Sequence, residues 1–323
     1  MTTSPGRRPA FRIATDADLS IAEHMPLAIE AIRDALRAHA DESLTAPARV
    51  RASVGPGDFV FTTGGCARRG IFGFRAYNDF TPPGRDEDQV VTVFDAEGRL
   101  RGLCLGEKLG RIRTGAIGGC AVDLLARRDA RTLAIIGAGR QAEAQLHAVL
   151  AVREIAAVRI SSRSSDRVAQ FAARAESSSG LPVTRCATVD EAIDGADIVV
   201  LATTSTTPLL AADQVAAGTH ITTVGPKRRG QCELDPEVAR GAVIATDSPS
   251  QARGYPDPFF LDDAEIERLV SLSRIASDPT VGRTHDHQVT LFCSVGLAGT
   301  EVFVADRLLG VASRAGDSNG RSH

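Results

Sequence analysis

The stretch that most constrains the fold of this chain is RTLAIIGAGRQAEAQL, residues 131–146. Residues 133–136 are apolar and typical of a strand buried on both faces of a parallel sheet. Small residues follow at 137–142 with G-x-G-x-x-A spacing, and apolar positions three and four apart predict a helix over residues 141–150. A strand, a tight turn and a helix in this order are the context that a dinucleotide-binding turn requires.

Each small residue has a physical role in such a turn. Gly137 makes the turn, Gly139 lets the backbone approach a pyrophosphate, and Ala142 packs the helix against the strand. The unpaired N–H groups of the helix N-terminus then face the phosphates. We therefore predict a dinucleotide site whose pyrophosphate is held by Gly137, Gly139, Arg140 and Gln141. The alternative is a glycine turn in an α/β protein that binds nothing.

The second strand of this unit, expected at residues 158–162, indicates the type of cofactor. Its carboxyl end, where an acidic residue would bind the adenosine ribose 2′-OH, carries Ser162, Arg163 and Ser164 instead. Hydroxyls beside a guanidinium suit a 2′-phosphate, because this doubly acidic group binds a fork of donors and is repelled by a carboxylate. The sequence predicts NADP(H) rather than NAD(H), with a solvated arginine after a strand as the alternative.

Composition excludes several functional classes. The net charge is -3, with 37 Lys and Arg against 40 Asp and Glu, and Trp is absent, so no basic or base-stacking surface for nucleic acid is expected. No apolar run approaches the length of a membrane span. The six cysteines form no C-x-x-C pair, which argues against disulfides and a zinc site. We expect a cytoplasmic protein with reduced thiols and no metal, nucleic-acid or membrane partner.

Two patterns divide the rest of the chain. Between residues 49 and 105, short alternating segments separated by Gly and Pro turns predict a mostly antiparallel sheet. After residue 131, strands and helices alternate, which predicts a doubly wound parallel sheet. The predicted fold class is α/β, a Rossmann sheet plus an N-terminal α+β domain. Ligands bind at the carboxyl ends of such strands, where Thr203, Val224 and Gly225 lie.

Several ordered motifs resemble the ornithine cyclodeaminase and mu-crystallin family. They are RIRTGA (111–116), LARRDARTLAIIGAGRQ (125–141), GADI (195–198), the segment from GTHI to Gly225 (218–225), ELD (233–235) and TLFCSVGLA (290–298). The resemblance implies a homodimer in which residues 1–112 and a helix at 297–312 form a substrate-binding and dimerisation domain. It assigns residues 113–296 to a Rossmann NAD(P)-binding domain. The composition of residues 313–323 predicts a disordered tail.

The family likeness implies hydride transfer at the Cα of an amino or imino acid whose carboxylate is bound by basic residues. Carried over to this sequence, Arg113 of the R-T-G motif contacts substrate and Thr114 contacts the cofactor. The family's P-x-R arginine falls at Arg49, although a gapless count favours Arg51. Side chains two apart in a strand share a face, so both stay candidates.

The resemblance also assigns roles to residues that follow the last parallel strand, and one position in the first domain departs from the family. Ser294 is expected at the nicotinamide and Val295 at the substrate, while Cys293 is expected to be a buried, inert thiol. Arg75 takes the place of the family's substrate lysine. It retains the charge and can bind a carboxylate, but it cannot be deprotonated.

Lys227 occupies the place of an aspartate that cyclodeaminases carry. This change should repel the side-chain ammonium of ornithine. Three interpretations remain open: Lys227 attracts a second acidic group of the substrate, it donates a proton to an imine nitrogen if desolvated, or it is a solvated loop lysine. We predict catalytic roles for Lys227, Arg75 and Arg113.

The predicted function is that of an NADP(H)-dependent oxidoreductase of the ketimine reductase or amino-acid dehydrogenase type. Its substrate is a small amino or imino acid with a carboxylate, and hydride moves to or from the Cα. One alternative is an ornithine cyclodeaminase that forms proline and ammonia with catalytic NAD. Another is an NADPH-binding protein of low turnover.

Overall fold

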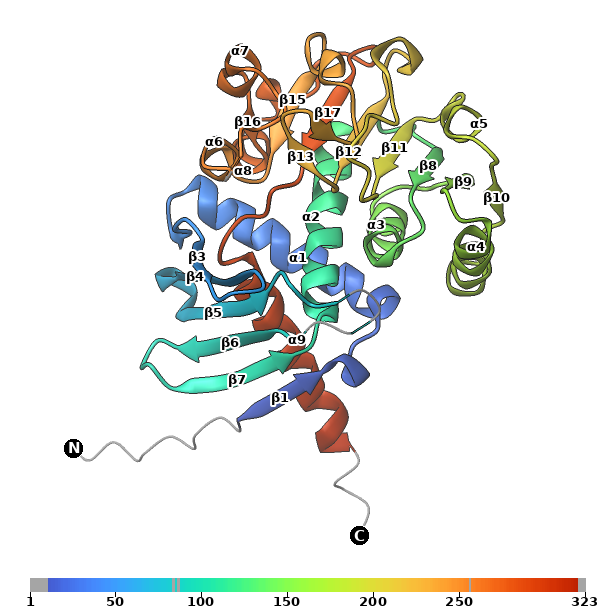
Figure 1. The fold of residues 1–323 in the computed structure, drawn as a ribbon. Coiled ribbons are helices and arrows are strands. Elements are labelled where there is room, and N and C mark those ends of the chain that lie inside the picture. Colours follow the sequence, from blue (N-terminus) through green and yellow to red (C-terminus); the bar gives the residue numbers. More distant parts are fainter. Residues whose placement is uncertain (1–10, 83–84, 86–87, 256, 319–323) are drawn as a thin grey trace, which may run out of the picture. The chain divides into compact units, whose positions relative to one another are not determined.

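The computed structural model describes residues 11–82, 85, 88–255 and 257–318, with side chains described through residue 310 (Figure 1). These residues form two compact units. The first comprises the residues through Ser20, Glu42–Leu109 and the residues from Ala298 on, and the second comprises Ile21–Asp41 and Gly110–Leu297. Among the described residues, no helix is both long enough and apolar enough to cross a membrane.

A mixed sheet and one long helix make up the first unit. The sheet has the order β1-β7-β6-β5-β4-β2, with β3 paired to β4, and only β1 and β7 pair in parallel. The strands are β1 (Arg12–Thr15), β2 (Leu44–Thr45), β3 (Val50–Ser53), β4 (Asp58–Cys66), β5 (Ile71–Asn78), β6 (Val90–Asp95) and β7 (Leu100–Leu105). Helix α9 (Thr300–Ser318) packs on one face of the sheet. A Cβ on Gly64 would lie 2.5 Å from the Cα of Gly299, so this glycine lets the segment before α9 approach the sheet closely.

The opposite face of this sheet carries apolar side chains that are open to solvent. Phe72 lies opposite Phe94 on the neighbouring strand, and their rings stack with centroids 5.3 Å apart. The exposed apolar residues of the sheet strands are Ile13, Val50, Phe59, Phe72, Leu100 and Leu105. We call this set the outer sheet face.

The second unit is built on an eight-stranded parallel sheet of order β10-β9-β8-β11-β12-β17-β15-β16. The strands are β8 (Thr132–Ile136), β9 (Ala157–Ser161), β10 (Val183–Arg185), β11 (Ile198–Leu201), β12 (His220–Thr223), β15 (Val243–Thr246), β16 (Val270–Ser271) and β17 (Thr290–Cys293). A short hairpin, β13 (Lys227–Arg228) and β14 (Gln231–Cys232), follows β12. The strand order runs outward in both directions from between β8 and β11, which confirms the predicted doubly wound sheet.

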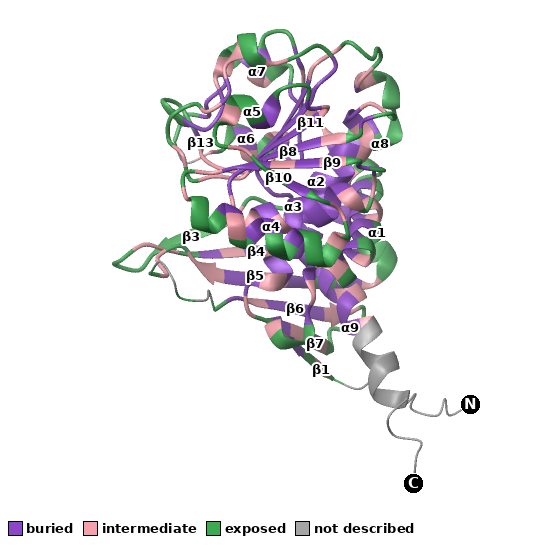
Figure 2. Ribbon diagram, turned by 90° about the vertical axis from the view of Figure 1, so that its right-hand side faces the viewer, coloured by how far each residue is buried: buried purple, intermediate pink, exposed green. Residues whose placement is uncertain are grey.

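Helices cover both faces of this sheet, and its central strands are buried on both sides (Figure 2). Alternate residues of β8 belong to different cores, with Leu133 and Ile135 in one and Ala134 and Ile136 in the other. The helices are α1 (Ile21–Ala40), α2 (Lys108–Leu125), α3 (Arg140–Leu150), α4 (Ser165–Ser179), α5 (Val189–Ile193), α6 (Pro249–Arg253), α7 (Asp263–Glu267) and α8 (Leu272–Ser277). This double burial explains why the strands read as continuous apolar runs.

The compact units differ from the predicted domain boundaries in two places. Helix α1 falls within the predicted first domain, yet it packs on α3 and α8 and belongs to the second unit. Its apolar stripe, which includes Ile29 and Ile32, is buried there. Helix α9 continues through Ser318, beyond the predicted end at residue 312. Residues 319–323 of the predicted disordered tail lie outside the described residues.

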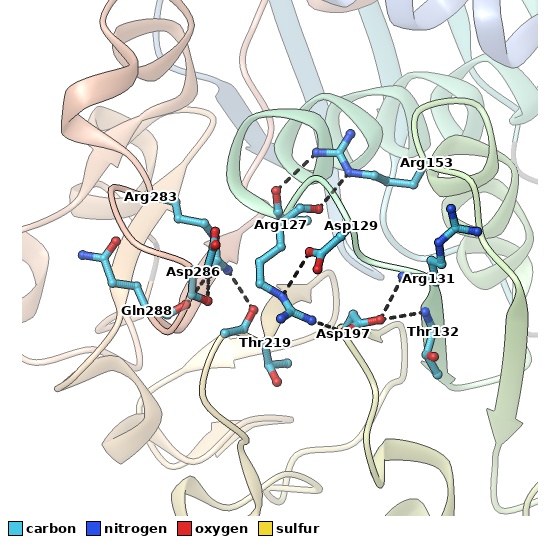
Figure 3. Close-up of polar contacts among 12 residues, drawn as sticks. Arg127, Asp129, Arg131, Thr132, Arg153, Asp197, Thr219, Arg283, Asp286 and Gln288 are labelled. Carbon is cyan, nitrogen blue, oxygen red and sulfur yellow. Dashed lines mark hydrogen bonds and ion pairs between the residues drawn. The ribbon is translucent and has the colours of Figure 1, made fainter.

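Charged side chains at the amino ends of the parallel strands, the amino edge of the sheet, bind backbone groups (Figure 3). Asp197 accepts hydrogen bonds from the N–H groups of Arg131 (2.8 Å) and Thr132 (2.9 Å) and forms an ion pair with Arg127. Arg153 and Arg283 donate to carbonyls at the C-terminal end of α2, among them Val122 O (3.0 Å) and Leu125 O (2.6 Å). The carbonyl of Leu125, the last residue of α2, has no partner within the helix and is satisfied in this way.

Candidate cofactor and active site

The turn between β8 and α3 has the geometry that its sequence predicts. Gly137 has φ +112°, and a Cβ there would lie 2.3 Å from the carbonyl oxygen of Ala202, so only glycine fits. A Cβ on Gly139 would meet nothing within 4 Å, so this glycine borders open space. Helix α3 starts at Arg140, directly after the turn, and Ala142 is fully buried. The N-terminus of α3 can therefore receive a phosphate group.

A cavity of about 370 Å³ opens at the carboxyl ends of β8, β9 and β11. Its lining contains Ile136, Gly137, Ala138, Gly139, Ser161, Ser162, Arg163, Arg167, Ala187, Thr188, Val189, Ala202, Thr203, Thr204, Ser205 and Leu209. Among these described residues Arg163 and Arg167 carry the only charges, and none is Asp or Glu. The cavity has the size of a small-ligand site and joins the glycine turn to a positively charged end.

Five of the predicted cofactor residues line this cavity: Gly137, Gly139, Ser162, Arg163 and Thr203. The other predicted positions lie outside its lining. The Ser164 hydroxyl accepts a hydrogen bond from the backbone N–H of Arg167 (3.3 Å) and so caps α4. Sequence reasoning missed Arg167, which lies four residues after Arg163, in the first turn of that helix.

Arg113 and Thr114 lie on α2, which packs closely against the dinucleotide helix α3. Arg113 is buried. The Thr114 carbonyl accepts a hydrogen bond from Gln145 Nε2 (3.2 Å), and a Cβ on Gly115 would lie 2.7 Å from the carbonyl oxygen of Ala144. The small residues of the R-T-G motif thus fix Arg113 and Thr114 relative to the helix that starts at the glycine turn.

A buried carboxylate joins the carboxyl ends of β11 and β12. Glu233 is 0% exposed. Its Oε2 accepts hydrogen bonds from the Thr203 N–H (3.0 Å) and hydroxyl (2.8 Å), and its Oε1 accepts from the Thr223 hydroxyl (2.8 Å) and the Gly225 N–H (2.6 Å). A Cβ on Gly225 would lie 2.5 Å from Glu233 Oε2, so a glycine is required there. Glu233 belongs to the ELD motif of the family, but no role was predicted for it from the sequence.

Asp247 makes the corresponding connection between β15 and β17. Its two carboxylate oxygens accept hydrogen bonds from the N–H groups of Val295 (2.9 Å) and Gly296 (2.7 Å). The Ser294 N–H donates to the carbonyl oxygen of Thr223 (3.1 Å), which links β17 to β12. Ser294, predicted at the nicotinamide, and Val295, predicted at the substrate, are therefore both held by backbone contacts at one edge of the sheet.

Lys227, at the start of the hairpin after β12, is 2% exposed, so its interpretation as a solvated loop lysine is wrong. Its Nζ donates to the carbonyl oxygen of Gly225 (2.7 Å). Burial lowers the pKa of Lys227, while the nearby carboxylates of Glu233 and Asp247 act to raise it. Burial also raises the pKa of the Cys293 thiol to about 12, which fits an inert cysteine. Lys227 is thus a desolvated amine beside two buried carboxylates.

Of the three candidate substrate arginines in the first unit, Arg51 and Arg75 lie on strands of its sheet and Arg49 does not. Arg75, with an 11% exposed side chain, donates to Gln89 Oε1 through Nε (3.0 Å) and Nη2 (2.6 Å). Its Nη1 lies 3.5 Å from the buried carboxylate of Glu301, and its guanidinium lies over the ring of Tyr77. Arg51 is more exposed and pairs with surface carboxylates, whereas Arg49 directly precedes β3. Arg75 is therefore the more rigidly held cation.

The chain is similar in sequence to proteins of one known family. A model of the ornithine cyclodeaminase/mu-crystallin family matches residues 13–310. The chain belongs to this family. It is 34% identical over 226 residues to Delta(1)-pyrroline-2-carboxylate reductase of Bacillus cereus, covering 68% of this chain and 69% of the relative. It is also 32% identical over 250 residues to the ornithine cyclodeaminase of Brucella suis, covering 73% and 67%.

A solved structure is similar to this chain over nearly its whole length. It is Delta(1)-pyrroline-2-carboxylate reductase of Thermococcus litoralis in complex with NADH and L-proline, with a TM-score of 0.83 and 25% identity. The match covers 94% of this chain and 98% of that one. Membership supports an enzyme that uses a nicotinamide cofactor, and the cavity beside the glycine turn is the place in this chain that fits one.

Proposed function

We propose that this chain is an NADP(H)-dependent oxidoreductase that transfers hydride to the C=N carbon of a small imino acid, or from the Cα of the corresponding amino acid. The observation that carries the cofactor preference is the charge of the cavity beside the glycine turn. Arg163 and Arg167 lie at its lining together with Ser161 and Ser162, and no carboxylate is present among its described lining residues. A 2′-phosphate finds two guanidiniums and two hydroxyls there.

The energetics favour the phosphorylated cofactor. Hydrogen bonds to charged groups contribute roughly 1.5–3 kcal/mol each, which corresponds to about a tenfold or greater change in affinity. NAD(H) would offer a neutral 2′-hydroxyl at the same place and would leave both guanidiniums without an anionic partner from the cofactor. The second arginine therefore strengthens the preference for NADP(H) that the sequence predicts.

A bound nicotinamide cofactor supplies the hydride, and the remaining tasks fall to residues of this chain. We assign carboxylate binding to Arg113, which is buried on α2. Arg75, which Gln89 and Glu301 hold in place, is a separate candidate for the same task. Arg49 and Arg51 remain proposed substrate contacts of the same kind. Fixed cations orient the substrate carboxylate, so that the carbon to be reduced is held in one position.

We assign the proton that reaches the imine nitrogen to Lys227. Only two of the 37 basic residues in this chain are lysine, Lys108 and Lys227, so arginine replaces lysine almost everywhere. A guanidinium cannot give up a proton in a protein, whereas a desolvated amine can. The lowered pKa of Lys227, caused by burial, brings this amine closer to the range in which a general acid works.

The same lysine argues against ornithine as the substrate. Ornithine brings a side-chain ammonium, and Lys227 is a cation at the place where cyclodeaminases carry an aspartate. An imino acid such as Delta(1)-pyrroline-2-carboxylate, the substrate named for two relatives, has no second cation. We propose this compound as the first substrate to test.

We further propose that the chain forms a homodimer through the outer sheet face. The exposed apolar residues of this face lie on several neighbouring strands, and α9 covers the opposite face. An apolar face of this kind marks an interaction site, and a second copy brings an identical apolar face in a two-fold arrangement. Light scattering of Phe72→Glu should give a monomer where the unaltered chain gives a dimer. A dimer that persists in this variant would contradict the proposed interface.

The decisive experiment is calorimetric titration with NADPH and NADH, followed by NADPH oxidation in the presence of cyclic imino acids. We expect NADPH to bind at least tenfold more tightly than NADH and to be consumed with Delta(1)-pyrroline-2-carboxylate. Tighter binding of NADH would overturn the cofactor assignment. Formation of proline and ammonia from ornithine without net NADH would show the cyclodeaminase alternative, and NADPH binding without turnover would show a binding protein.

A further inference from the structure

Glu233 lies at the centre of a buried hydrogen-bond network that reaches the cofactor cavity. The Ser205 N–H donates to the Thr203 hydroxyl (3.0 Å), which donates to Glu233 Oε2 (2.8 Å). Thr203, Thr204 and Ser205 all line the cavity. The backbone that forms this wall is therefore fixed by a carboxylate that lies behind it.

The same carboxylate reaches the neighbouring strand. Its other oxygen accepts from the Thr223 hydroxyl and from the Gly225 N–H, and the Gly225 carbonyl accepts from Lys227 Nζ. Burying an ionised group is costly unless it is fully hydrogen-bonded. Four donors satisfy Glu233, and each belongs to the end of β11 or of β12. These strand ends are where ligands of a doubly wound sheet bind.

We propose that Glu233 is a positioning residue of the cofactor and proton-transfer site: it holds the cavity wall at Thr203 and fixes Gly225, the residue that binds Lys227. This inference rests on the proposed function, since it assigns to Glu233 the placement of groups that the proposed reaction uses. Glu233 acts through Thr203, Gly225 and Lys227 and touches neither cofactor nor substrate.

Glu233 also affects the protonation of Lys227 through its charge. The titratable groups that act on the Lys227 ammonium are the carboxylates of Glu233 and Asp247 and the Cys293 thiol, and the thiol is neutral because its pKa is raised to about 12. Glu233 therefore stabilises the protonated amine as well as its position. Removal of that charge should allow Lys227 to lose its proton at a lower pH.

The first test is Glu233→Gln, which keeps the shape but changes the acceptor pattern. In the amide, an NH2 group replaces one of the two carboxylate oxygens, and each of these oxygens accepts two hydrogen bonds in the unaltered chain. The two donors at the end of β11, or the two at the end of β12, therefore face another donor. We expect NADPH to bind about tenfold more weakly, because a buried donor without an acceptor moves the backbone of the cavity wall. Binding of 2′,5′-ADP should change less than about threefold, because the arginines that we assign to its 2′-phosphate lie outside this network.

The second readout is the pH profile of kcat/KM for the imino acid. Glu233→Gln should move the alkaline limb to lower pH, which a merely structural role would not do. The matched control is Glu237→Gln, because Glu237 is half exposed and pairs with Arg240 on the surface (2.8 Å). This control should bind NADPH and titrate as the unaltered enzyme does.

The proposal is overturned if Glu233→Gln binds NADPH normally, or if it loses NADPH and 2′,5′-ADP equally while the alkaline limb stays in place. Should that variant fail to fold, Thr223→Val removes one donor and keeps the carboxylate, and it should weaken NADPH binding about threefold without affecting 2′,5′-ADP. Unchanged binding there would overturn the proposal as well. If the unaltered enzyme prefers NADH, the cofactor assignment fails, and the Glu233 test is made with NADH and ADP.

Discussion

The two edges of the parallel sheet use charged residues in different ways. At the amino edge, Arg153 and Arg283 donate to backbone carbonyls at the end of α2, and Asp197 accepts from the start of β8 (Figure 3). At the carboxyl edge, Glu233 and Asp247 accept from backbone N–H groups that follow the strands. The amino edge thus relies mainly on arginine, which stays charged, whereas the carboxyl edge surrounds a buried lysine with carboxylates.

This difference indicates that the charged residues of the amino edge stabilise the fold, whereas those of the carboxyl edge serve the reaction. An arginine bound to several carbonyls fixes the backbone and cannot exchange a proton at ordinary pH. A buried lysine with a lowered pKa can exchange one, and the carboxyl edge is also where the cofactor cavity opens. Changes at the amino edge should therefore alter unfolding more than catalysis, and changes at the carboxyl edge should do the reverse.

The largest expected effect is at the amino edge, in Arg153→Met. Arg153 has a 4% exposed side chain and donates to Asp123 and to carbonyls that include Val122 O and Ala126 O. Loss of this guanidinium removes several charge-assisted hydrogen bonds at a buried site, and we expect the free energy of unfolding to fall by about 4 kcal/mol. Urea denaturation measures this fall, and NADPH affinity of the folded variant should be unchanged.

The matched control is Arg131→Met. Arg131 is mostly exposed, and its side chain pairs with Glu154 at 3.5 Å, so its loss should cost less than about 1 kcal/mol. Equal losses in the two arginine variants would show that the carbonyl contacts of Arg153 do not stabilise this edge. A loss of NADPH affinity in Arg153→Met would contradict the proposal that the amino edge affects stability and not cofactor binding.

The next effect is at the carboxyl edge, in Lys227→Met. If Lys227 supplies the proton, kcat for imine reduction should fall about 100-fold while NADPH affinity stays within about threefold. In the unaltered enzyme, activity should decline as the pH rises through the pKa of Lys227, which lies below its ordinary value of 10.5. Lys227→Arg keeps the charge without a transferable proton, so near-normal activity of that variant would contradict the assignment.

A smaller effect is expected at the amino edge, where His220 should make the free energy of unfolding depend on pH in acid. Burial lowers the pKa of His220, the first residue of β12, to about 3, with the charges of Arg283 and Arg153 acting in the same direction. The unfolded chain takes up this proton near pH 6.5, so His220 favours the folded state above that pH and this contribution is lost as the pH falls from 6.5 to about 3. At pH 5 the loss should be about 2 kcal/mol.

His220→Gln should remove most of this acid dependence. The amide can replace one of the hydrogen bonds that the imidazole makes to Thr290 (2.8 Å) and Thr222 (3.1 Å). His285→Gln is the control, because His285 lies exposed in the loop before β17 and should leave the dependence intact. Chemical denaturation at pH 5 and pH 7.5 gives the comparison, and an unchanged difference in His220→Gln would refute the assignment.

How much of these edges could be predicted from sequence depends on how local their contacts are. The glycine turn was predictable, because Gly137, Gly139 and Ala142 act through spacing within one strand–turn–helix unit. Arg163 was predictable for the same reason. The sequence of helix α1 shows an apolar stripe but not which surface covers it, so the sequence alone does not place this helix in the second unit.

The network of Glu233 shows the limit of that reasoning. Its partners come from residues 203, 223 and 225, and only the pairing of β11 with β12 brings the first of these next to the others. The burial of Lys227 likewise depends on tertiary packing that no local pattern encodes. The small number of lysines in the chain is a signal, visible in the sequence, that Lys227 has a special role.

The smallest expected effects test the positively charged end of the cofactor cavity. Arg163→Ala and Arg167→Ala should each weaken NADPH binding about tenfold and change NADH binding less than about threefold, because each removes a charged donor to the 2′-phosphate. Both side chains are exposed, so neither change should lower stability by more than about 0.5 kcal/mol. If both cofactors lose affinity equally, the arginines bind a group that the two share, such as the pyrophosphate. If only Arg163→Ala discriminates, the second guanidinium is a surface charge, and the NADP(H) preference rests on the residue that the sequence already indicates.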